Sequence, residues 1–120
     1  LIEGIALGSF CEAVKLDHLL FTLTVYQRLF QHDSNTQLSD HHSCRLGQWY
    51  QNSDTQALYG RARSYQQLEQ PHRNVHEAAH EALHAAQSKD WNKVLRCVQE
   101  MEQGSMQVNQ LLSELAQHSG

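Results

Sequence analysis

Four histidines follow one another at a constant spacing of four residues in the segment PHRNVHEAAHEALHAAQ, residues 71–87: His72, His76, His80 and His84. Side chains four residues apart are neighbours on one face of a helix, so two of these imidazoles can reach a single ion. The inner segment HEAAH, residues 76–80, also has the spacing of a zinc peptidase motif, in which Glu77 would activate water. The chemistry of this segment therefore depends on which histidines bind a metal.

The apolar residues of this segment indicate which histidines face the protein interior. Five of them gather on one side of the expected helix: Val75, Ala79, Ala82, Leu83 and Ala86. His72 lies about 36° and His76 about 76° from the centre of that side, whereas His80 and His84 lie about 116° and 156° away. A buried imidazole needs a partner. This favours His72 and His76 as metal ligands, with His80 as the main rival.

A closed structural zinc site takes four protein ligands, so two more must come from elsewhere in the chain. His18 lies in KLDHLLF, between two apolar stripes of a long helix, where an unpaired imidazole would be unfavourable. Cys44 begins the segment CRLGQWY, directly after a polar loop. Taken singly, such residues are more often a core histidine and a small buried hydrophobic residue. His18 and Cys44 are thus candidate zinc ligands only in combination with each other and with the two histidines of the helix.

Composition excludes several classes of function. The 120 residues are expected to form one domain, residues 1–120, and the missing initiator Met suggests a segment cut from a longer protein. With 9 Lys and Arg against 13 Asp and Glu, and no basic block, the chain lacks the cluster of positive charge that binds nucleic acid or anionic lipid. It also lacks the apolar run of roughly 20 residues that a membrane span needs. Three distant cysteines, Cys11, Cys44 and Cys97, argue against a disulfide framework and for a reducing, cytoplasmic setting.

Only one Pro and 6 Gly occur, and no segment alternates with a period of two, so the chain is predicted to be all-α. We expect a four-helix-bundle-like domain with an additional short helix that carries Cys44. The predicted helices span about 6–31, 44–52, 55–69, 71–88 and 91–117, with a polar loop at 32–43. Pro71 is placed in the first turn of its helix, and Asp90 is a candidate N-cap for the last one.

Two neighbouring apolar stripes on the first helix predict that it makes contacts on two sides, with its own bundle and with a partner chain. Their members are Ala13, Leu16, Leu20, Leu23 and Phe30 in one stripe, and Phe10, Val14, Phe21, Val25 and Leu29 in the other. Cys11, Cys97, Trp49 and Trp91 are expected in the core, and Gly47 and Gly104 where helices approach closely. His41 and His42 are expected to be exposed. Asp17 and Asp40 are expected either to hydrogen-bond a zinc histidine or to be solvated caps.

The order of these residues resembles the chemoreceptor zinc-binding domain, or CZB domain. That family has a His with an aromatic residue three positions later, then Cys-x-hydrophobic-Gly-x-aromatic, then His-x-x-x-His. The chain supplies every element in order: His18 with Phe21, then Cys44, Leu46, Gly47 and Trp49, then His72 and His76. Phe21 stands where Trp is commoner in the family. The flanking segments VKLDHLLF, DHHSCRLGQWY and LEQPHRNVH are most similar to the bacterial chemoreceptor members.

The resemblance implies one Zn²⁺ ion held by His18, Cys44, His72 and His76 in a small helical bundle that forms homodimers. It also implies a regulatory and not a catalytic role, in which zinc or hypochlorous acid alters signalling from a cytoplasmic bacterial chemoreceptor to the chemotaxis kinase. Two alternatives stay open: a purely structural zinc clip in a dimerisation module, and the regulatory domain of a diguanylate cyclase. The peptidase interpretation is disfavoured, because four protein ligands leave zinc no site for water.

Overall fold

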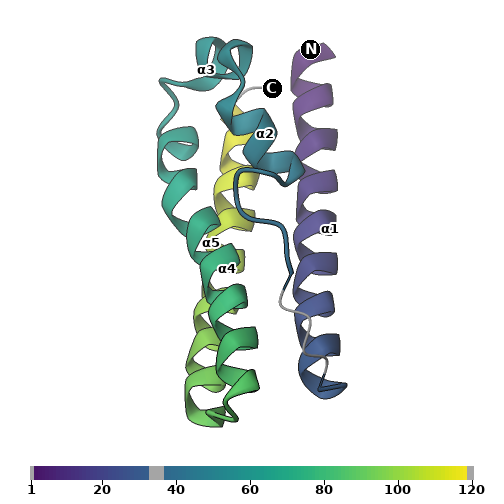
Figure 1. The fold of residues 1–120 in the computed structure, drawn as a ribbon. Helices are drawn as coiled ribbons and strands as arrows, with labels where there is room; N and C mark the ends of the chain where they lie inside the picture. Colours follow the sequence, from purple (N-terminus) through teal and green to yellow (C-terminus); the bar gives the residue numbers. More distant parts are fainter. Residues whose placement is uncertain (1, 33–36, 119–120) are drawn as a thin grey trace.

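The computed structural model describes residues 2–32 and 37–118, and five helices account for most of them. These are α1 (Ile2–Phe30), α2 (Arg45–Gln51), α3 (Ser53–Tyr59), α4 (Arg63–Gln87) and α5 (Trp91–His118). Figure 1 shows α1, α4 and α5 side by side along the long axis, with α2 and α3 at the end where α1 begins. The predicted all-α bundle, with a short helix directly after Cys44, is confirmed.

The prediction that a new helix begins at Pro71 is wrong. Helix α4 runs without interruption from Arg63 to Gln87, with Pro71 inside it. A proline in a helix interior loses one backbone hydrogen bond and costs about 3 kcal/mol. The cost is offset by tertiary packing, because Pro71 is buried in a helix face that also buries Leu68 and Val75. As a result, His72 lies in the middle of a long helix, where its backbone is held on both sides.

Helices α4 and α5 pack closely, as expected from Gly104. A Cβ atom at Gly104 would lie 2.9 Å from Cγ2 of Val75 and 3.1 Å from the carbonyl oxygen of Pro71. The α5 residues of this seam are buried: Val94, Met101, Val108, Leu112 and Leu115. The predicted cap at the start of α5 is confirmed, since the Asp90 carboxylate accepts a hydrogen bond from the backbone N–H of Lys93 at 3.2 Å. This pair of helices is the stable base on which α1 and the loop rest.

Helix α1 buries one of its two apolar stripes and exposes the other. Val14 and Val25 are fully buried against the bundle. By contrast, Leu16, Leu20 and Leu23 are each more than half exposed, and the Phe30 side chain is 81% exposed. The prediction that Trp91 is a core residue is wrong, because it is 46% exposed at the first position of α5. Cys11 and Cys97 are buried packing residues, as expected.

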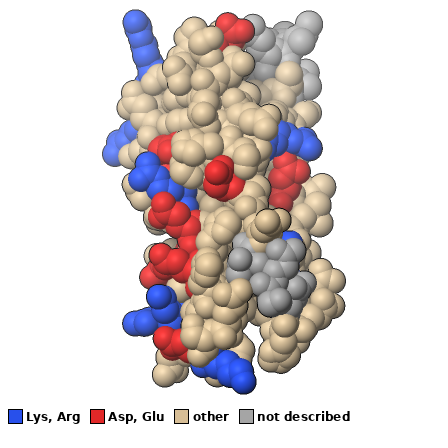
Figure 2. Space-filling model, in the orientation of Figure 1, with Lys and Arg blue, Asp and Glu red and all other residues tan. Residues whose placement is uncertain are grey.

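The surface carries no broad basic area on the face that Figure 2 shows, for the residues that are described. Lys and Arg side chains alternate there with Asp and Glu along one edge of the molecule. None of the described helices combines the length and apolarity that crossing a membrane requires.

Candidate metal centre

Four side chains from three separate parts of the chain converge beside the middle of α4: His18, Cys44, His72 and His76. We refer to them as the four-ligand cluster. Each offers one nitrogen or sulfur atom, and these atoms all lie within 4.8 Å of one another. Around a tetrahedral zinc ion, with bonds of about 2.0 Å to nitrogen and 2.3 Å to sulfur, ligand atoms stand roughly 3.3–3.6 Å apart. The cluster can therefore close on one ion through small movements of its side chains.

Helix α4 and the start of α2 bring the first two ligand atoms together. Sγ of Cys44 lies 3.1 Å from Nε2 of His72. Cys44 is the N-cap residue of α2, with extended backbone angles, and its side chain makes no capping hydrogen bond. The Cys44 sulfur thus lies between the first turn of α2 and His72 of α4. Figure 1 shows the loop that leads to α2 passing between α1 and α4.

Three buried imidazole nitrogens of the cluster lack hydrogen-bond partners among the described residues. Both ring nitrogens of His18 and Nε2 of His76 are buried without a hydrogen bond. Buried polar atoms are almost always paired, and leaving one unpaired costs about 1–3 kcal/mol. Nδ1 of His76 lies 2.8 Å from the carbonyl oxygen of Ser39, which fixes the ring and turns Nε2 towards the cluster. One metal ion would satisfy Nε2 of His76 and one of the two His18 nitrogens at once, since an imidazole binds an ion through a single nitrogen.

Burial keeps the three imidazoles neutral. It lowers the pKa of His18 to about 4. It also lowers the pKa of His72 to about 2 and that of His76 to about 4, and the neighbouring histidines add to both shifts. Burial raises the pKa of the Cys44 thiol, although the backbone N–H groups of Gly47 and Leu46 oppose this. Neutral imidazoles are ready to bind metal at neutral pH, whereas zinc must displace a proton from the thiol.

Gly47 allows the loop to lie against the first turn of α2. A Cβ atom at this position would overlap the carbonyl oxygen of His41, and it would lie 2.9 Å from the carbonyl carbon of His42. Because both are backbone atoms, no side-chain rotation can relieve the overlap. The expected close approach at Gly47 is confirmed, and its role is to place the loop that carries Cys44.

Substituting Gly47→Ala is expected to weaken zinc binding, because the loop must move away from α2 and carry Cys44 with it. The expected loss is tenfold or more in zinc affinity, the range seen when groups that orient a ligand are removed. Gly8→Ala is the matched control, since a Cβ there would meet no atom within 4 Å. Competition titration with a chromophoric zinc chelator measures both variants. Equal affinity of the two variants would contradict this role for Gly47.

The other histidines of the sequence lie outside the cluster. His80, the rival ligand, is half-buried one turn beyond His76, and His84 is exposed. His42 is exposed, as expected. The expectation that His41 is exposed is wrong, because its side chain is 12% exposed and its Nε2 atom lies 3.0 Å from Oε1 of Glu69.

Neither aspartate supports a cluster histidine. Asp17 forms an ion pair with Arg45 at 3.1 Å. Asp40 accepts hydrogen bonds from the backbone N–H groups of His42 and Ser43 within its own loop. The supporting acceptor is the Ser39 carbonyl, which the sequence could not indicate, because every residue has a carbonyl and only the path of the loop selects this one.

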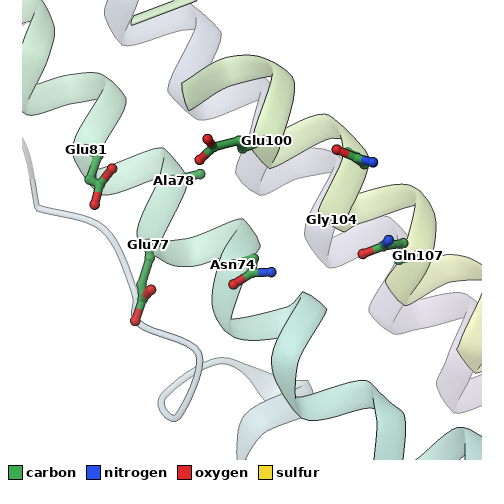
Figure 3. Close-up of a pocket in the computed structure, with 8 residues that line it drawn as sticks. Asn74, Glu77, Ala78, Glu81, Glu100, Gly104 and Gln107 are labelled. Atoms are coloured by element: carbon green, nitrogen blue, oxygen red, sulfur yellow. The ribbon is translucent and has the colours of Figure 1, made fainter. Parts of the chain in front are cut away.

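Glu77, the catalytic residue of the peptidase interpretation, lies in different surroundings. It lines a polar pocket between α4 and α5, together with Asn74, Glu81, Glu100 and Gln107. Figure 3 shows these side chains on the two helices around that pocket. The lining includes no member of the four-ligand cluster. Glu77 is therefore not placed to activate water on an ion held there.

A family model described as the chemoreceptor zinc-binding domain matches residues 18–83. The match begins at His18 and contains the whole four-ligand cluster. Neither the curated proteins nor the solved structures provide a match to the chain.

Proposed function

Because this chain belongs to the chemoreceptor zinc-binding domain family, we propose that its four-ligand cluster holds one zinc ion whose occupancy regulates a bacterial chemoreceptor. The observation that carries the proposal is the convergence of three imidazoles and one thiol, two of whose rings, His18 and His76, have buried nitrogens without a hydrogen bond. With four protein ligands, the ion has no open position for a substrate or water, which supports a regulatory role.

Zinc occupancy would control the packing of the domain. The ligands come from α1, from the loop before α2 and from α4, so one ion would tie together three parts of the chain that the sequence separates. The free energy of binding a structural zinc ion is available to the fold. Helix α1 has far less contact with α4 than α5 has, so a tie between α1 and α4 acts where the packing is thin. Gain or loss of zinc would therefore change how α1 sits on the bundle.

Cys44 would be the point of attack for an oxidant. Bound zinc keeps its sulfur a thiolate, which is the form that oxidants attack. Hypochlorous acid would transfer its oxygen and proton to the sulfur and leave as chloride, which converts the thiolate to sulfenic acid. Sulfur loses two electrons in this step and chlorine gains them. The ion would lose its only sulfur ligand, and Cys44 with α2 would separate from α4.

Treating the zinc-loaded domain with about one equivalent of hypochlorite is expected to release zinc and to produce a sulfenic acid at Cys44. Chromophoric chelation measures the zinc, and mass spectrometry after dimedone labelling locates the modified residue. Cys97→Ser is the matched control, because Cys97 is a buried thiol outside the cluster and its replacement should leave the release unchanged. A full receptor that keeps its hypochlorite response with Cys44→Ser would show that the oxidant route is wrong.

We also infer that the domain acts as a cytoplasmic homodimer and that the change in α1 reaches the chemotaxis kinase through the rest of the receptor. The exposed stripe of Leu16, Leu20 and Leu23 on α1 supports a partner surface on this helix. Apolar side chains gathered on one exposed helix face are typical of protein contacts. The same helix carries His18, so a zinc ligand and the proposed contact surface lie on one rigid element.

A further inference from the structure

The loop before α2 is joined to α4 by a hydrogen bond that lies outside the four-ligand cluster. Nε2 of His41 lies 3.0 Å from Oε1 of Glu69. An ionised carboxylate can only accept, so Nε2 of His41 carries the proton and donates it. The His41 side chain is 12% exposed and that of Glu69 34%, so the bond is partly shielded from water.

The backbone of His41 contacts the cysteine ligand itself. Its carbonyl oxygen lies 3.9 Å from Sγ of Cys44, within the range of a weak thiol hydrogen bond. The same oxygen fills the space that a side chain at Gly47 would need. The His41 ring therefore contacts α4, while its carbonyl group contacts the Cys44 thiol and the first turn of α2.

Two contacts join the loop to α4 at the same offset along the chain: the bond from His41 to Glu69 and the contact from Cys44 to His72. Each joins two residues that are 28 positions apart. The turn at 41–44 thus lies alongside the single turn of α4 at 69–72, with one contact at each end. Fixing His41 on Glu69 therefore fixes where the Cys44 sulfur meets His72.

We propose that the His41–Glu69 hydrogen bond positions Cys44 and thereby sets the zinc affinity of the cluster. This inference rests on the proposed zinc site. Neither His41 nor Glu69 binds the ion. They act through the loop, by holding the sulfur at α4 before zinc arrives and by opposing its departure afterwards. Groups that orient metal ligands typically contribute 10–100-fold to metal affinity.

Zinc affinity of the purified domain is to be measured by chelator competition for His41→Ala, Glu69→Ala and the double variant. We expect each single variant to bind zinc at least tenfold more weakly and the double variant to lose little more, because the two residues act as one unit. His84→Ala is the matched histidine control, since His84 is exposed and lies outside the four-ligand cluster. Arg73→Ala is the second control, since it removes the other partner of Glu69, at 3.6 Å. Both controls should stay within threefold of the wild type.

Two further readouts separate positioning from a loss of fold. Thermal unfolding of the metal-free variants should match that of the metal-free wild type. The absorption of the cobalt-substituted variants at saturation should keep its sulfur-to-cobalt charge-transfer band, because Cys44 is still a ligand once enough metal is present. A destabilised fold would change the first readout and a lost ligand the second.

A loss of less than tenfold in Glu69→Ala would overturn the inference, even if His41→Ala failed to fold. Additive losses in the double variant would overturn it as well. A different result marks failure of the zinc site itself: the wild type would bind no zinc, or Cys44→Ser would bind it as tightly as the wild type.

Discussion

Replacing any member of the four-ligand cluster with alanine is expected to abolish stoichiometric zinc binding, whereas His80→Ala leaves it intact. A closed site uses all four protein ligands, and losing one removes a metal bond and opens a position to water. The effect should exceed the 10–100-fold loss that follows removal of a group which only orients a ligand. The zinc content of the purified domain, measured by elemental analysis, should therefore fall from about one ion to near zero.

His80 is the sharpest control for this result, because it is a histidine on the same helix as His72 and His76, one turn beyond the cluster. Its ring is half-buried, so His80→Ala also tests whether a general change in α4 affects zinc. Loss of zinc with His80→Ala but not with His72→Ala would show that the histidine pair is His76 and His80.

Removing zinc with a strong chelator is expected to lower the melting temperature of the domain by on the order of 15 °C. Free zinc at a thousand times its dissociation constant adds about 4 kcal/mol to the free energy of unfolding. A domain of this size changes its melting temperature by roughly 3–5 °C for each kcal/mol. Circular dichroism on heating measures the shift. Cys44→Ala should show no shift with the same chelator, and an equal shift in that variant would contradict the assignment.

The metal-free domain should also lose stability as the pH falls below the ordinary histidine pKa of 6.5. Folding lowers the pKa of His18 and of His76 to about 4. Between these values the unfolded chain binds protons that the folded chain does not, so the free energy of unfolding decreases with falling pH. The loss is complete once the folded histidines are themselves protonated. Zinc binding weakens over the same pH range, because protons compete with zinc for the ligand atoms.

Much of the site could be predicted because helical periodicity is a local property. The positions of Val75 and Ala79 placed His72 and His76 towards the core and His80 away from it, and the three residues lie accordingly. His18 and Cys44 are different, because nothing local joins them to α4. Only the order and spacing of the family motif indicated that they belong with the helical pair.

The errors come from residues whose environment is set by distant parts of the chain. Pro71 carries the signal of a helix start, yet packing against Gly104 and the core outweighs that local preference. Trp91 has a large apolar side chain of the kind usually found in a core, but it stands at the end of the bundle and is exposed. His41 belongs to a polar segment, and only the path of the loop shows that its ring meets Glu69 on another element.

Helix α2 has only seven residues. Isolated helices shorter than about 12 residues are marginal in water, so a helix of this length keeps its shape only while its neighbours hold it. Its support comes from contacts with other helices: Trp49 lies against Phe10 of α1, and the Tyr50 ring stacks on that of Tyr65 of α4, with 4.2 Å between the ring centroids. We expect α2 to lose its helical shape as a whole if it is released from its neighbours, because a helix of this length is not stable alone.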